Sequence, residues 1–179
     1  ADFDIEDEDL IKEEDVVVTV THQGYIKRMP TDTYKQQRRG GKGIIATDIK
    51  SDDFVEHLFT TNTHNYVLFF TSNGRVYWLK AYNIPSASRY SVGRNIANVL
   101  LLSKDEKITS MIPINEFNET EFLIMVTKNG IVKKVSLDNF ARPRKGGIIA
   151  INLRENDSLV GVKLTNGEQK YIIGTKNGL

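Results

Sequence analysis

The 179-residue sequence contains no cysteine, and its longest apolar runs are short. The absence of cysteine excludes a disulfide scaffold, a thiol nucleophile and cysteine-ligated zinc, and it fits a reducing compartment. No run of about 18 apolar residues is present, so we expect no membrane-spanning helix. Residues 1–15 lack the apolar stretch of a secretory signal, so we expect no signal peptide there.

Patterns typical of catalytic sites are also missing. The three histidines, His22, His57 and His64, do not stand in H-E-x-x-H or another close metal-ligand spacing. No Gly-x-Ser-x-Gly nucleophile turn occurs. The acids within residues 52–56 flank a predicted strand, where we expect them to cap a turn. We therefore predict structural or surface roles for these side chains and no catalytic residue.

The net charge of +1 hides an uneven distribution along the chain. Residues 1–15 carry nine acids and one base, a net charge of −8, whereas the remaining residues carry 23 bases and 14 acids, a net charge of +9. An acidic leading segment followed by a basic body favours a polyanionic partner for the body. A soluble domain with a solvated acidic linker gives the same balance, so charge alone does not decide.

An internal repeat is the most informative pattern in the sequence. Four segments share the order Thr, any residue, Asn or Gln, and Gly, with glycines 50, 56 and 48 positions apart. The four glycines are Gly24, Gly74, Gly130 and Gly178. Apolar, β-branched or aromatic runs precede each segment and follow the first three. Asn-Gly between such runs predicts a β-hairpin in which both turn residues have positive φ.

Two further short apolar runs follow each hairpin, among them Ile96–Leu101 in the second interval. This makes about four strands per repeat of roughly 50 residues, the spacing of propeller-type blades. No helical periodicity extends over 11 residues. We predict an all-β fold of four-stranded antiparallel blades, with an acidic linker at 1–15 and a partial ring at 16–179. The repeats cover about residues 16–65, 66–120 and 121–167, and residues 168–179 begin a fourth.

The chain stops just after the turn of the fourth hairpin. Because a blade depends on stacked neighbours and an unpaired strand leaves an open sheet edge, we expect the sequence to be a fragment of a longer protein.

A basic, glycine-rich segment follows the first hairpin. Residues 37–43 read Gln-Arg-Arg-Gly-Gly-Lys-Gly, and we expect a loop there. Arg38, Arg39 and Lys42 suit phosphate oxygens, and glycines allow close approach of the backbone. A P-loop is excluded, because Gly-Lys is followed by Gly43 and a predicted strand rather than by Ser or Thr and a helix. A solvated basic loop is the alternative interpretation.

Similar loops recur at the same place in the next two repeats. The second repeat contributes Arg89 and Arg94, and the third contributes Arg142, Arg144 and Lys145. In a ring of blades, equivalent loops would form a positive track that suits an extended polyanion. The other interpretation is that these cations only keep the loops soluble.

The seven residues Gln37, Arg38, Arg39, Gly40, Gly41, Lys42 and Gly43 resemble the gyrase-A box without any departure. The flanking segments Glu14–Thr19, His22–Arg28, Phe54–Phe59 and Gly74–Lys80 also resemble the C-terminal domain of the DNA gyrase A protein. The resemblance covers nearly the whole chain. Topoisomerase IV proteins, in which the box is degenerate or missing, are similar to a lesser degree.

The resemblance implies a β-pinwheel, of which this chain holds about three and a half of six blades. It implies a non-catalytic domain that wraps double-stranded DNA without sequence specificity, with the box residues as the main contacts. Gyrase A would assemble with gyrase B into a cytoplasmic, nucleoid-associated heterotetramer that introduces negative supercoils. The family places the catalytic tyrosine, ATP and Mg²⁺ outside this region, so no cofactor is expected here.

Two other functions stay open at this stage. One is the DNA-binding domain of topoisomerase IV, which would bend DNA less. The other is a protein-interaction propeller whose basic loops serve only solubility, and which would bind DNA weakly and without salt dependence.

Overall fold

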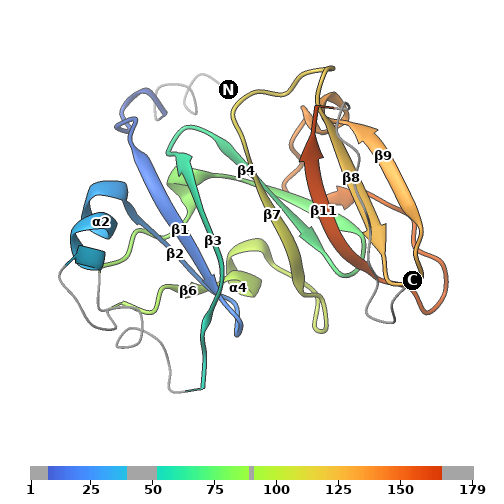
Figure 1. Cartoon of the computed structure of the whole chain (residues 1–179), viewed down its shortest axis with the longest axis horizontal. Coiled ribbons are helices and arrows are strands. Elements are labelled where there is room, and N and C mark those ends of the chain that lie inside the picture. The colour runs from blue at the N-terminus through green and yellow to red at the C-terminus, as the bar shows by residue number, and fades with distance from the viewer. Residues whose placement is uncertain (1–7, 40–51, 89–90, 167–179) are drawn as a thin grey trace. The chain divides into compact units, whose positions relative to one another are not determined.

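A computed structural model describes residues 8–39, 52–88 and 91–166 (Figure 1). Most of the regular structure in these residues is β-strand, and the all-β prediction is confirmed. The chain divides into two compact units. Unit 1 comprises residues 1–67 and 79–103, and unit 2 comprises residues 68–78 and 104–179.

Unit 1 contains a four-stranded sheet in the order β3-β1-β2-β6. Its strands are β1 (Asp15–Thr21), β2 (Tyr25–Pro30), β3 (Val55–Asn62) and β6 (Arg94–Asn95). The first strand, β1, pairs antiparallel with β2 on one side and with β3 on the other. Because it is central and covered on both faces, residues 16–21 are all buried. This explains why β1 reads as a continuous apolar run rather than an alternating one.

The second sheet has the order β10-β5-β4-β7, and most of it lies in unit 2. Its strands are β4 (Tyr66–Thr71), β5 (Arg75–Lys80), β7 (Ile108–Ile114) and β10 (Ile148–Ile149). The third sheet, also in unit 2, has the order β11-β8-β9 among the described residues. It consists of β8 (Phe122–Thr127), β9 (Val132–Ser136) and β11 (Leu159–Thr165). Buried Phe69, Phe70, Leu123 and Met125 are core residues of unit 2.

In the second and third repeats, the short strand after the basic loop joins the sheet of the preceding repeat. Strand β6, from the second repeat, pairs antiparallel with β2 of the first hairpin. Strand β10, from the third repeat, pairs antiparallel with β5 of the second hairpin. Each of these two four-stranded sheets is therefore completed by its successor in the sequence. The repeat boundaries predicted from the sequence do not coincide with the boundaries of the sheets.

The three hairpins in the described residues share one turn, which differs from the predicted one. Gly24, Gly74 and Gly130 have φ of 93°, 78° and 89°. Among the described non-glycine residues only Leu101 and Asn156 have positive φ, so the Asn or Gln before each glycine does not. In the first two hairpins, this left-handed glycine ends a three-residue connection. In the third, Ile131 also lies between β8 and β9, and its carbonyl accepts from the Thr127 N–H at 2.9 Å. The first three predicted hairpins are confirmed, and the fourth, at Gly178, lies outside the described residues. The prediction of two positive-φ residues per turn is wrong for the three described turns.

The carboxylate of Asp53, just before strand β3, stabilises the turn of the first hairpin. One oxygen of Asp53, Oδ1, accepts hydrogen bonds from the backbone N–H groups of Gln23 (3.0 Å) and Phe54 (2.9 Å). Burial opposes ionisation, but these two bonds and the Thr21 side chain outweigh it and hold the pKa of Asp53 below its ordinary value. The prediction that the acids of residues 52–56 cap a turn is confirmed for Asp53.

The turn threonine also meets a carboxylate in the other two repeats. In the third, Asp157 Oδ1 accepts from the N–H groups of Asn129 (2.9 Å) and Ser158 (2.8 Å). Despite an opposing desolvation effect, hydrogen bonds from these groups and from Thr127 lower the pKa of Asp157. In the second, the Thr71 hydroxyl donates to Glu106 Oε2 at 2.6 Å. The repeated Thr of the turn motif is therefore paired with a carboxylate 30 to 35 positions later in the sequence.

Two segments that the sequence predicts as a loop and as a strand are helical in the structure. Residues predicted to form the start of the basic loop belong to helix α2 (Thr31–Arg39), which contacts β1 and β2 (Figure 1). Residues Ile96–Leu101, predicted as a strand, form helix α4 (Ile96–Leu100) and its C-terminal cap. The Asn95 side chain accepts from Ala97 N at 3.0 Å and caps the start of α4. Short 3₁₀ segments, η1 (Ala81–Asn83) and η2 (Leu137–Phe140), follow β5 and β9.

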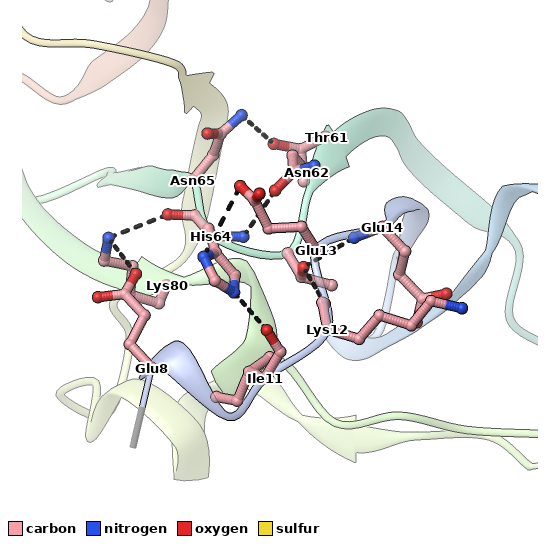
Figure 2. A network of polar contacts seen from close by, with 11 residues as sticks. Glu8, Ile11, Lys12, Glu13, Glu14, Thr61, Asn62, His64, Asn65 and Lys80 are labelled. Carbon is pink, nitrogen blue, oxygen red and sulfur yellow. Dashed lines mark hydrogen bonds and ion pairs between the residues drawn. The ribbon is translucent and has the colours of Figure 1, made fainter. Parts of the chain in front are cut away.

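The described part of the acidic leading segment packs on the turn between β3 and β4 (Figure 2). The His64 ring donates from Nε2 to the Ile11 carbonyl at 2.7 Å. The Thr63 hydroxyl donates to the Lys12 carbonyl at 2.8 Å. Lys80 Nζ forms an ion pair with Glu8 Oε1 at 3.0 Å. Residues 8–14 are thus held by side-chain contacts with residues 51 to 72 positions away.

We expect Gly147→Ala to destabilise the chain by about 2 kcal/mol, because φ is positive and the new Cβ would press on a strand. Gly147 has φ of 72°, and its Cβ would lie 2.8 Å from both the Tyr77 ring and the Val76 carbonyl oxygen. Gly146→Ala is the matched control, since nothing lies within 4 Å of its Cβ position. Urea unfolding of both variants tests this, and equal unfolding midpoints would contradict it.

The lowered pKa values of Asp53 and Asp157 predict that part of the free energy of unfolding is lost at acidic pH. Their ionised forms stabilise the fold above the ordinary pKa of 3.8, and this contribution is lost as the pH falls through the lower folded-state values. Replacing both by Asn should therefore flatten the fall in unfolding free energy below about pH 4. The control is Asp105→Asn, at an exposed turn position. An unchanged pH slope in the double variant would refute the assignment.

Candidate nucleic-acid interface

The strongest sequence motif lies at the end of helix α2. Gln37, Arg38 and Arg39 are the last three residues of the helix, and Gly40, Gly41, Lys42 and Gly43 lie outside the described residues. The prediction of a loop throughout this motif is wrong for its first three residues. Asp32 in the first turn of this helix complements the positive end of the helix dipole.

The third repeat's basic loop runs from η2 to β10, and its cations are exposed. Arg142, Arg144 and Lys145 are all solvent-exposed, in agreement with a surface role. The loop ends in a turn in which the Gly147 N–H donates to the Arg144 carbonyl at 3.0 Å. Positive φ at Gly147 then lets the backbone pass close to the Tyr77 ring and enter β10. The predicted cations therefore sit on a loop whose base is fixed to β5.

The second repeat's loop has the same construction in unit 1. Arg94 is exposed at the start of β6, opposite Ile26 in the register with β2. Gly93 has φ of 91°, and a Cβ there would collide with the Ile26 carbonyl. The Ile96 N–H donates to the Gly24 carbonyl at 2.7 Å and ties the end of the loop to the first turn. Arg89, the other predicted cation of this loop, lies outside the described residues.

Some cations of the basic body are engaged within the fold. The Arg28 guanidinium donates through Nε to the Ile84 carbonyl at 2.7 Å and through Nη2 to the Tyr82 carbonyl at 3.3 Å. Lys80 contacts Glu8 and the His64 carbonyl, and its Nζ lies 4.3 Å from the centre of the Tyr66 ring. Sequence reasoning could not separate these structural cations from those in the loops, because the partners are distant in sequence.

Further exposed cations lie on unit 2 outside the predicted loops. Lys133 and Lys134 are exposed on β9, and Lys134 Nζ lies 4.3 Å from the centre of the Phe122 ring. Sequence reasoning missed them as candidates, although the Val-Lys-Lys-Val pattern of a predicted strand places one lysine on each face. Lys133 Nζ also donates to the Ala150 carbonyl at 3.4 Å. Lys134 therefore extends the exposed basic surface of the third repeat beyond its loop.

The histidines take part in structural and surface contacts. His22 stacks on Phe54 with ring centroids 4.8 Å apart, and its Nδ1 lies 3.2 Å from Glu56 Oε1. His57 Nε2 lies 3.8 Å from Glu56 Oε2. Among residues 8–39, 52–88 and 91–166, no group of three or more acidic or histidine side chains could hold a metal ion. Within these same ranges, no helix combines the length and hydrophobicity that spanning a membrane requires.

Comparison with known proteins gives a consistent relationship. A family model described as DNA gyrase C-terminal domain, beta-propeller, matches residues 15–62, 65–115 and 121–166. The DNA gyrase A protein of Clostridium acetobutylicum is 54% identical over 179 residues, which are 100% of this chain and 22% of that protein. The gyrase A protein of Halalkalibacterium halodurans is 53% identical over 174 residues, which are 97% of this chain and 21% of that protein.

Two solved structures have the same fold. The C-terminal domain of DNA topoisomerase IV superposes with a TM-score of 0.74 at 32% identity, covering 88% of this chain and 48% of that one. A DNA gyrase A C-terminal domain superposes with a TM-score of 0.65 at 26% identity, covering 85% and 48%. The chain therefore spans about half of these domains and about a fifth of the complete gyrase A proteins.

The three matched segments correspond to the three repeats, and each contains one of the hairpins described above. The predicted relationship to the A protein of DNA gyrase, a type II topoisomerase, is confirmed by sequence identities near one half over nearly the whole chain. The chain belongs to the family of DNA gyrase C-terminal domains, as the β-pinwheel domain of a gyrase A protein.

Proposed function

We propose that this domain binds double-stranded DNA without sequence specificity and bends it around its basic loops. The observation that carries the proposal is that two successive repeats present exposed arginine or lysine at the same place, on a loop fixed to the preceding hairpin. Phosphate contacts carry no base information, so such loops suit any DNA sequence. The proposed domain consists of residues 16–179, preceded by an acidic linker at residues 1–15.

The proposed contacts are ranked by the motif that contains them. The primary set is the gyrase-A box, and the secondary set comes from the two later loops. The primary residues are Gln37, Arg38, Arg39, Gly40, Gly41, Lys42 and Gly43. The secondary residues are Arg89, Arg94, Arg142, Arg144 and Lys145. Bending DNA over tens of base pairs costs several kcal/mol, and contacts with many phosphates are needed to offset this.

In the complete enzyme, the domain would act as a non-catalytic part of an ATP-dependent gyrase. Wrapping would present a neighbouring DNA segment to the cleavage gate, so that strand passage introduces negative supercoils. The partners would be the rest of gyrase A together with gyrase B, in a heterotetramer in the bacterial cytoplasm that is associated with the nucleoid. ATP and Mg²⁺ would be bound elsewhere in that assembly.

A topoisomerase IV domain is the second candidate, favoured by the TM-score of 0.74 with a topoisomerase IV structure. The intact box motif and the higher sequence identity with gyrase A proteins favour gyrase. A wrapping assay separates the two, since the topoisomerase IV domain is expected to bend DNA less. A protein-interaction propeller would show neither wrapping nor salt-dependent DNA binding.

We expect the triple change Arg38→Ala, Arg39→Ala and Lys42→Ala to reduce negative supercoiling by the complete enzyme about tenfold or more, because three phosphate contacts would be lost. Supercoiling of relaxed plasmid measures this, with ATP-independent relaxation as the internal reference. The charge-matched control replaces three exposed lysines outside the basic loops, namely Lys104, Lys107 and Lys128. Full supercoiling by the box variant would refute the primary contacts.

Replacing Arg142, Arg144 and Lys145 by alanine should lower the salt dependence of DNA binding by the 179-residue chain. With a slope of about −0.9 per phosphate contact, the slope of log K against log salt should become less steep by up to about 3. Dissociation constants measured at several salt concentrations provide the slope. Parallel plots for the variant and the unaltered chain would show that these cations do not contact phosphate.

A further inference from the structure

A cation outside the third repeat's basic loop, on strand β5, holds the backbone of this loop. Arg75, the first residue of β5, donates from Nη2 to the carbonyl oxygen of Gly146 at 3.0 Å. Gly146 directly follows Lys145 and lies inside the turn from Arg144 to Gly147. The guanidinium of Arg75 thus contacts the backbone of the loop whose side chains are the proposed DNA contacts.

Arg75 is itself held by its surroundings. Its guanidinium carbon lies 5.9 Å from the centre of the Tyr77 ring. The Tyr77 hydroxyl donates to both oxygens of Glu106, at 3.0 and 3.2 Å. Burial raises the pKa of Tyr77, and Glu106 adds to this effect, so the phenol keeps its proton and the bond. The ring is therefore fixed, and it packs against Gly147 at the position where a Cβ would not fit.

The loop of the second repeat has an anchor of the same kind. Lys27 of β2 donates from Nζ to the Ser91 carbonyl at 2.9 Å. Ser91 lies two residues before Gly93 and three before the exposed Arg94. The anchor in each case is a cation on the second strand of the preceding hairpin, and the acceptor is a loop carbonyl one or two residues before the positive-φ glycine.

This geometry assigns the two cations a role different from that of the loop cations. A free loop loses conformational entropy when it is immobilised on DNA, and ordering it beforehand lowers that loss. Hydrogen bonds from charged donors to loop carbonyls provide such ordering. We propose that Arg75 and Lys27 are positioning residues, which hold the basic loops in the conformation that contacts DNA phosphates. The proposal rests on the proposed DNA-binding function.

A double-mutant cycle on the 179-residue chain tests Arg75. The four proteins are the unaltered chain, Arg75→Met, the pair Arg144→Ala with Lys145→Ala, and the combination. Their affinities are measured at low salt with a duplex of about 30 base pairs. Arg75→Lys tests rescue by a retained donor, and Lys104→Met, an exposed turn lysine, controls for the loss of one charge. Urea unfolding establishes that each variant is folded.

We expect Arg75→Met to weaken DNA binding about fivefold in the unaltered chain, to have almost no effect when Arg144 and Lys145 are absent, and to be largely rescued by Arg75→Lys. An equal loss in both backgrounds would show that Arg75 contacts phosphate directly, and no loss would show that the loop needs no anchor. Either result overturns the inference. Absence of DNA binding by the unaltered chain would instead refute the proposed function.

The second repeat provides an independent cycle if Arg75→Met does not fold. Lys27→Met is combined with Arg94→Ala, and the same non-additivity is expected. A fully additive result there, with both single variants folded, overturns the inference for Lys27.

Discussion

The structure depends on the pairing of each short strand, β6 or β10, with the second strand of the preceding hairpin. Neither hairpin forms a four-stranded sheet with strands of its own repeat alone. The fourth strand, at the edge of the sheet, comes from the residues that follow the basic loop of the next repeat. That pairing requires the chain to turn sharply against the neighbouring strand, and Gly93 and Gly147 permit this because they have positive φ and no Cβ in the way. The position of each basic loop is therefore a consequence of sheet completion. A loop that must end in a strand on the neighbouring sheet is confined to one edge of that sheet, whatever its own side chains are.

Local sequence signals predicted the parts of the fold that local contacts determine. The turn motif located all three described hairpins, because glycine alone adopts the required left-handed conformation without strain. The detailed turn type was missed because Asn-Gly also fits a two-residue turn. In the first and third hairpins the observed turn is stabilised by the carboxylates of Asp53 and Asp157, which are distant in sequence. Helix α4 was missed because Ile96–Leu101 is as apolar as a strand, and the Asn95 cap is a weak signal by itself. The pairing of β6 and β10 with the sheet of the preceding repeat was missed, because a two-residue strand is too short to show a periodic pattern.

The candidate interface was predicted in composition but not in detail. Arg94, Arg142, Arg144 and Lys145 are exposed as expected, because polar loops with glycine lie at the surface. Their dependence on Lys27 and Arg75 could not be read from the sequence, since each anchor is more than 60 positions from its loop carbonyl. Net charge also overstates the number of cations that are free to bind a partner. Arg28 and Lys80 count as basic residues, yet they bind carbonyl or carboxylate groups of the domain itself. The number of cations available to a polyanion is thus smaller than the number of Lys and Arg residues in the basic body.

The packing of residues 8–14 against the turn at Thr63 and His64 sets the length of any tether that precedes the domain. An extended chain spans about 3.4 Å per residue, so immobilising these residues shortens the reach of such a tether by roughly 24 Å. The Glu8–Lys80 ion pair, at 3.0 Å, fixes the position of Glu8 within unit 1. Changes at His64 or Lys80 would therefore release residues 8–14 and lengthen the segment that can move, even though neither residue belongs to a basic loop.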